Sequence, residues 1–78
     1  MRAMSLVNNV AQHLHSARTA RKLSQATLAK AAGVSVSYVS MLERGQRSPP
    51  LEMLEALAKA LRVSPAELLQ AGGGKRRR

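Results

Sequence analysis

Two short segments joined by a Gly-Val-Ser turn limit the possible folds more than any other feature of the sequence. Residues 25–32 and 36–44 each have apolar residues at helical spacing, and each is only two to three turns long. Ser24 and Ser35 stand where helix N-caps are expected, and Gly33 is the residue best suited to a left-handed position after a helix. The sequence therefore predicts two short helices that meet at a tight turn.

The rest of the chain supplies an aliphatic core. Its 78 residues include no Phe, Trp or Cys and a single Tyr, so Leu, Val, Ala and Met must fill the interior. Apolar periodicity predicts further helices over 51–61 and 65–70, and a first helix from residue 8 or 9 to 21 with Asn8 as its N-cap. We therefore expect an all-α, compact five-helix domain over residues 1–71.

Charge is distributed unevenly along the chain. Thirteen Lys and Arg residues against four acidic ones give a net charge of +9. Residues 1–50 carry seven basic residues and one acidic residue, whereas residues 51–74 carry two basic and three acidic ones. A basic half on so small a domain favours a polyanionic partner, usually nucleic acid, over a merely solvated basic surface.

The last seven residues, 72–78, read Gly-Gly-Gly-Lys-Arg-Arg-Arg. Three glycines are flexible and four like charges repel, so the sequence predicts a disordered basic tail. Two roles stay open for Lys75–Arg78: contact with a phosphate backbone, or only a solubilising end.

Catalysis, metal binding and membrane insertion are not expected. His13 and His15 are two residues apart, so on a helix they point in different directions, and no third ligand accompanies them. No acid partner or nucleophile motif supports a Ser–His pair. No apolar run approaches the roughly 20 residues that span a bilayer. The sequence predicts a cytoplasmic, nucleoid-associated protein that is not an enzyme and has no cofactor.

The segment from residue 24 to 45 has the outline of a helix-turn-helix, in which Ala29 permits a close helix crossing and Val34 fills the turn. Over about residues 8–70 the chain resembles the phage-repressor-like (Xre/Cro type) helix-turn-helix domains. The resemblance depends on Arg18, Ser24–Gln25, Leu28–Ala29, Gly33–Val34–Ser35, Glu43–Arg44–Gly45, Pro49, Leu57–Ala58–Leu61 and Val63–Ser64–Pro65. The sequence departs from the family at Lys22, where Gly is frequent, and at Pro50, where a Ser or Thr cap is usual.

The resemblance implies that the second helix lies across the DNA backbone and that the third enters the major groove. The residues that it places at base edges are Val36, Ser37, Ser40 and Met41. The residues that it places at phosphates are Lys22, Gln25, Ser35, Tyr38, Arg44 and Arg47. Arg18 and Glu43 match the family's structural ion pair, so Arg18 is not expected to contact DNA. No base-edge position carries Arg, Asn or Gln, so direct readout should be weak.

The expected function is that of a sequence-specific, double-stranded DNA-binding transcriptional regulator. The expected form is a repressor that binds a (pseudo)palindromic operator as a homodimer through the fourth and fifth helices. One alternative is an antitoxin-type protein-interaction module that also regulates its own promoter, which a co-purified partner would favour. Another is a general nucleoid or RNA binder that acts through charge alone, which a lack of sequence preference would favour.

Overall fold

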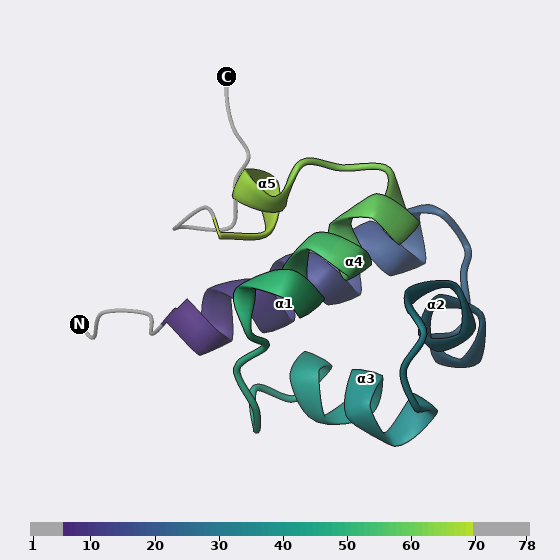
Figure 1. Ribbon diagram of the computed structural model, residues 1–78, viewed down its shortest axis with the longest axis horizontal. Helices are drawn as coiled ribbons and strands as arrows, with labels where there is room; N and C mark the ends of the chain where they lie inside the picture. The colour runs from purple at the N-terminus through teal and green to yellow at the C-terminus, as the bar shows by residue number, and fades with distance from the viewer. Residues whose placement is uncertain (1–5, 70–78) are drawn as a thin grey trace.

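The computed structural model describes residues 6–69, which form five helices (Figure 1). They are α1 (Leu6–Ala20), α2 (Gln25–Ala32), α3 (Val36–Glu43), α4 (Leu51–Leu61) and α5 (Pro65–Leu69). The predicted all-α class and the number of helices are confirmed. No helix within the described range is long and apolar enough to cross a membrane.

The helix bounds differ from the predicted ones mainly at the start of the chain. The predicted N-cap role of Asn8 is wrong, because α1 begins at Leu6 and Asn8 lies inside its first turn. The sequence contains the reason, since Leu6 continues the spacing of four that joins Val10 to Leu14. The expected tail at residues 72–78 lies outside the described residues.

Aliphatic side chains from all five helices form one core. The largest fully buried residues are Leu14, Leu28, Val39, Leu42, Leu57, Leu61 and Leu68. In this arrangement α1 packs against α3 and α5, while α2 packs against α3 and α4. Helices α2 and α3 are thus held by the rest of the domain, with α3 at one edge of the molecule (Figure 1).

Serine side chains cap the two helices of the motif as predicted. Ser24 Oγ accepts a hydrogen bond from the Thr27 backbone N–H at 3.0 Å, and Ser35 Oγ accepts one from the Tyr38 backbone N–H at 3.0 Å. Each cap satisfies a backbone donor that has no partner within its own helix. The local sequence therefore determines where α2 and α3 begin.

The first four helices end in the same kind of left-handed turn. The residues with positive φ are Lys22 (58°), Gly33 (78°), Gly45 (73°) and Arg62 (62°). In each turn this residue and the next donate backbone hydrogen bonds to carbonyls three and five residues earlier, which is the Schellman pattern. An L residue in the left-handed helical region costs about 1–2 kcal/mol that Gly avoids. Two of the four turns therefore carry a cation where the backbone favours Gly.

Candidate nucleic-acid interface

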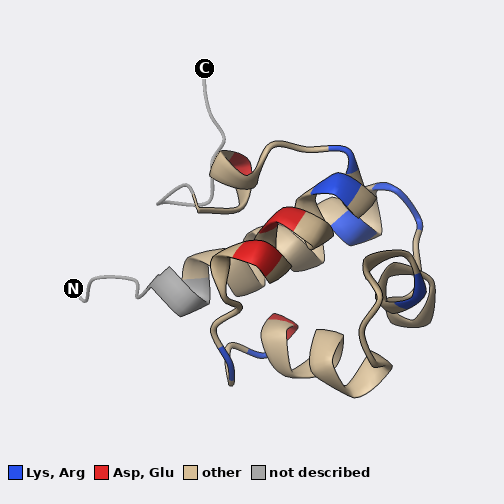
Figure 2. Ribbon diagram, in the orientation of Figure 1, with Lys and Arg blue, Asp and Glu red and all other residues tan. Residues whose placement is uncertain are grey.

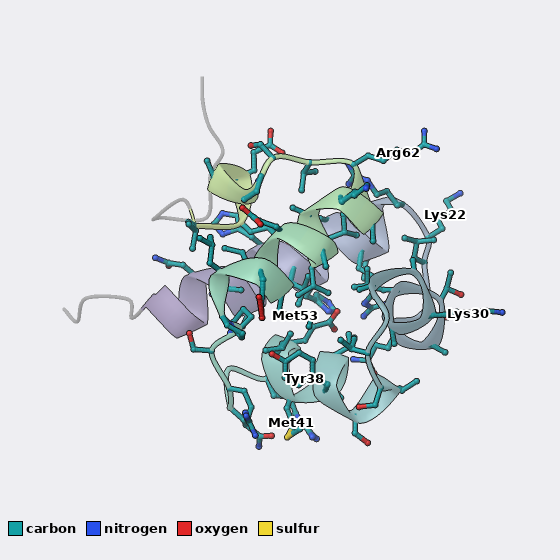
Figure 3. The ribbon with its side chains drawn as sticks, viewed as in Figure 1. Lys22, Lys30, Tyr38, Met41, Met53 and Arg62 are labelled. Carbon is teal, nitrogen blue, oxygen red and sulfur yellow. The ribbon has the colours of Figure 1, made fainter. Side chains whose placement is uncertain are left out.

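Two buried residues set the orientation of α3. Val39 and Leu42 are fully buried in the core. Because residues three or four positions apart share a helix face, Val39 and Leu42 turn one side of α3 inward and leave a continuous strip on the other side. The strip consists of Val36, Ser37, Ser40 and Met41, which are the four residues expected at base edges. Met41 lies at the outer edge of the molecule (Figure 3).

The exposed strip of α3 is chemically modest. Val36 is 45% exposed although it is apolar, and Ser37 is exposed. Ser40 and Met41 are half-buried, so they present only part of their side chains. The strip offers two hydroxyl groups that donate or accept hydrogen bonds and two apolar groups that suit a thymine methyl.

Cations follow directly after the α3 strip. Arg44 and Arg47 are exposed in the segment that joins α3 to α4, and Figure 2 shows basic residues along this segment. At the other end of α3, Ser35 is exposed, and its Oγ accepts the Tyr38 N–H, which leaves the hydroxyl hydrogen to donate outward. Tyr38 is half-buried and packs against the core.

A buried ion pair joins α1 to the end of α3. Arg18 Nε donates to Glu43 Oε2, and Arg18 Nη2 donates to Glu43 Oε1 at 3.0 Å, so the contact is bidentate. The two side chains are only 12% and 5% exposed. Arg18 Nη1 also donates to the Leu23 carbonyl oxygen at 2.7 Å, which fixes the loop before α2. The guanidinium therefore faces the interior of the motif rather than solvent.

Two further side chains complete the environment of Glu43. Gln25 Nε2 donates to Glu43 Oε1 at 3.0 Å, and His15 Nδ1 lies 3.2 Å from the same oxygen. Burial raises the pKa of Glu43, but hydrogen bonds from Arg18, Gln25 and His15 outweigh burial and hold this pKa below its ordinary value. The hydrogen bond to Glu43 raises the pKa of Arg18. The carboxylate thus stays charged and links α1, α2 and α3.

The Gln25 contact was not expected from the sequence. The sequence suggested only a phosphate contact for this residue, whereas one of its amide hydrogens bonds Glu43 and only the remaining one is left for a phosphate. His15, expected to be an ordinary surface residue, contacts both members of the ion pair. Gln25 and His15 lie 18 and 28 positions from Glu43 in the chain, and no signal in a single sequence indicates that residues so far apart are in contact.

Lys22 lies away from the α3 strip. It points outward on the same side of the molecule as Arg62, whereas Met41 lies at another edge (Figure 3). The sequence also gave no reason to group Lys22 with Arg62, since Arg62 lies in the half of the chain that carries more acidic than basic residues.

Comparison with known proteins agrees with this geometry. A family model described as helix-turn-helix matches residues 14–68. An uncharacterized HTH-type transcriptional regulator of Mycobacterium tuberculosis is 44% identical over 61 residues, which are 78% of this chain and 43% of that protein. The chain therefore spans less than half of the length of that relative.

Two solved structures are similar over a larger share of both chains. The restriction-modification controller protein C.AhdI of Aeromonas hydrophila is 45% identical with a TM-score of 0.77, over 80% of this chain and 94% of that one. The DNA-binding domain of the C2 repressor of phage P22 is 32% identical with a TM-score of 0.82, over 99% and 96%.

Proposed function

Because the chain belongs to the phage-repressor-like (Xre/Cro type) helix-turn-helix family, we propose that it is a sequence-specific regulator of transcription that represses from a duplex operator. The observation that carries the proposal is the outward strip of α3, which a buried ion pair and two buried apolar residues hold in one orientation. The similarity to a phage repressor's DNA-binding domain supports repression over activation.

In this proposal α3 enters the major groove, and Val36, Ser37, Ser40 and Met41 contact base edges. Arg44 and Arg47 contact phosphates on one side of the groove, while Ser35, Tyr38 and the free amide hydrogen of Gln25 contribute further phosphate contacts. Lys22 is left out of this interface because its side chain points from another side of the molecule.

Selection of bound sequences from a random duplex library tests the proposal. We expect an enriched motif with two related half-sites about one turn of DNA apart, as a two-fold dimer requires. Ser37→Ala should change the preferred bases, because it removes a base-edge hydroxyl while the helix keeps its core contacts. A library that shows no enrichment above random duplex contradicts sequence-specific regulation.

Salt dependence separates phosphate contacts from base contacts. Arg47→Ala should weaken binding to all duplexes alike and lower the slope of log affinity against log salt by roughly 1. Ser40→Ala serves as the matched control, because it removes no charge and should leave the slope unchanged. Equal slopes for Arg47→Ala and the unchanged protein would remove Arg47 from the interface.

We also propose a homodimer through α4 and α5. Of the three large exposed apolar residues within the described range, Val36 belongs to the α3 strip. The other two lie on α4 and α5: Leu51 is 66% exposed and Leu69 is 37% exposed. Leu51→Glu should shift the protein toward monomer in light scattering, whereas Val36→Thr should not. Identical masses for Leu51→Glu and the unchanged protein would reject this interface.

A further inference from the structure

Four cations lie at the C-terminal ends of α1 and α4. Arg21 and Lys22 follow α1, while Lys59 lies in the last turn of α4 and Arg62 directly follows that helix. We call these four residues the basic corner. Figure 2 shows basic residues on this side of the molecule and the acidic residues of α4 and α5 farther from it. Both ion pairs found within residues 6–69 involve Glu43, so no carboxylate there pairs with the corner.

The backbone at the basic corner favours a different residue. Lys22 and Arg62 have left-handed φ angles of 58° and 62°, and they occupy the same place in their turns as Gly33 and Gly45 do after α2 and α3. They are the only non-glycine residues with positive φ within the described range. Glycine would relieve the strain at both positions. Two cations thus occupy positions where they weaken the fold.

Helix electrostatics do not account for both residues. A cation near a helix C-terminus is favourable because it faces the negative end of the helix dipole. Arg21 and Lys59 already supply that charge from ordinary backbone conformations, and Arg21 Nη1 also donates to the Ala17 carbonyl oxygen at 3.0 Å. Strain that the local structure does not require points to a function elsewhere. Since Lys22 and Arg62 are exposed, that function involves a molecule outside the fold.

We infer that the basic corner binds the phosphate backbone of a second segment of duplex DNA while α3 occupies the first. This inference rests on the proposed DNA binding by α3. Duplex DNA carries one negative charge per roughly 1.7 Å of its axis, so it matches a group of unpaired cations. A duplex engaged by α3 lies against the edge that carries Met41, whereas Lys22 and Arg62 point outward from another side (Figure 3). The two surfaces are therefore free to hold separate duplexes and bridge them.

The test uses the full chain and two duplexes that share one arbitrarily chosen sequence. Each is about 30 base pairs long, which is close to three turns of DNA. One duplex is biotinylated and held on beads, and the other is fluorescent, so capture of the fluorescent duplex measures bridging. The test variant is Lys22→Gly with Arg62→Gly, and the matched control is Arg44→Ala with Arg47→Ala, which removes the same charge near α3. Fluorescence anisotropy with one duplex measures single-duplex affinity, and circular dichroism measures Tm.

The glycine variant should raise Tm by roughly 8 °C or more, since it relieves two strained positions in a small domain. Its single-duplex affinity should stay within about twofold of the unchanged protein, while bridging falls by roughly tenfold or more through the loss of two phosphate contacts. The control pair should lower single-duplex affinity by a similar factor. A rise in Tm combined with lost bridging excludes a merely structural role, which would lower Tm.

Four results would overturn the inference. Bridging that the glycine variant retains would assign capture of the second duplex to the two α3 helices of the proposed homodimer. A lower Tm for the glycine variant would show that the cations stabilise the fold. An equal loss of single-duplex affinity would place the corner on the same duplex as α3. If the unchanged protein binds one duplex but does not bridge two, the basic corner does not bind a second duplex, and its partner would instead be an acidic protein surface or a second copy of this chain. Failure of the proposed function is distinct, because the unchanged protein would then show no sequence preference even if it bridges.

Discussion

Replacing Glu43 by glutamine removes the charge that holds three helices together while keeping nearly the same shape. The carboxylate accepts two hydrogen bonds from Arg18 and one from Gln25, and its side chain is only 5% exposed. A glutamine amide has one oxygen to accept these donors, and its NH₂ group faces a donor. Arg18 is 12% exposed, so its positive charge remains largely buried without a counter-ion.

Breaking a buried pair in this way costs about 3–5 kcal/mol. A 78-residue domain has a total free energy of unfolding of roughly 4–12 kcal/mol, so Glu43→Gln should remove about a quarter of it or more. For a domain of this size the lower figure corresponds to a Tm decrease of about 12–24 °C. Thermal unfolding followed by circular dichroism at neutral pH measures this change.

The control for Glu43→Gln removes both charges at once. Arg18→Met with Glu43→Leu replaces the pair by apolar side chains of similar size, which is often close to neutral for stability. This double variant should be more stable than either Glu43→Gln or Arg18→Met alone. A loss below about 1 kcal/mol for Glu43→Gln, or a double variant whose loss equals the sum of the single losses, would refute the argument.

Further expected outcomes concern pH, a turn, a cap and the core. Folding lowers the pKa of Glu43, so its contribution to stability is complete above pH about 4.3, the ordinary pKa of Glu, and is lost as the pH falls through the folded pKa. Urea unfolding from pH 3 to 7 should therefore show a steeper loss of unfolding free energy at low pH for the unchanged protein than for Glu43→Gln. Gly33→Ala should cost about 1–2 kcal/mol in urea unfolding, because the new Cβ meets no heavy atom within 4 Å and only backbone strain remains; a much larger loss would indicate a clash. Ser24→Ala should lower the free energy of unfolding by about 1 kcal/mol and Ser24→Asp should not, whereas equal effects would argue against the cap. Leu57→Ala should cost about 2–5 kcal/mol, and Glu55→Ala, at an exposed position of the same helix, should serve as a nearly neutral control in the same denaturation series.

Most of the fold could be predicted from sequence because its signals are local. Serine before a helix and glycine after it mark a boundary through contacts only a few residues apart, as at Ser24, Gly33 and Ser35. The apolar spacing of α4 likewise predicted a buried stripe, which is confirmed at Leu54, Leu57, Ala58 and Leu61 but is wrong at Leu51, which is 66% exposed. Asn8 misled the prediction because asparagine favours an N-cap, while the apolar spacing that extends to Leu6 favoured helix.

The contacts of the candidate site were harder to predict from the sequence, because they join residues that are far apart in the chain. The outward strip of α3 follows from helix periodicity, but the hydrogen bond from Gln25 to Glu43 depends on how α2 and α3 cross. The burial of Asn9, which is 5% exposed, also has no local signal, since asparagine is a mostly exposed residue type. The basic corner could not be predicted from the sequence. Lys22 and Arg62 lie in different halves of the chain when charge is counted along it, whereas the fold brings them to one side of the molecule.

The different exposure of two sets of charges affects how the protein responds to ionic strength. Arg44 and Arg47 are open to solvent, so added salt competes directly with any phosphate that they hold. The pair of Arg18 and Glu43 is shielded from mobile ions by the surrounding protein and is screened far less. Rising salt should therefore release DNA from a domain that remains folded, with α3 still in its binding orientation, and lowering the salt again should restore binding without a refolding step.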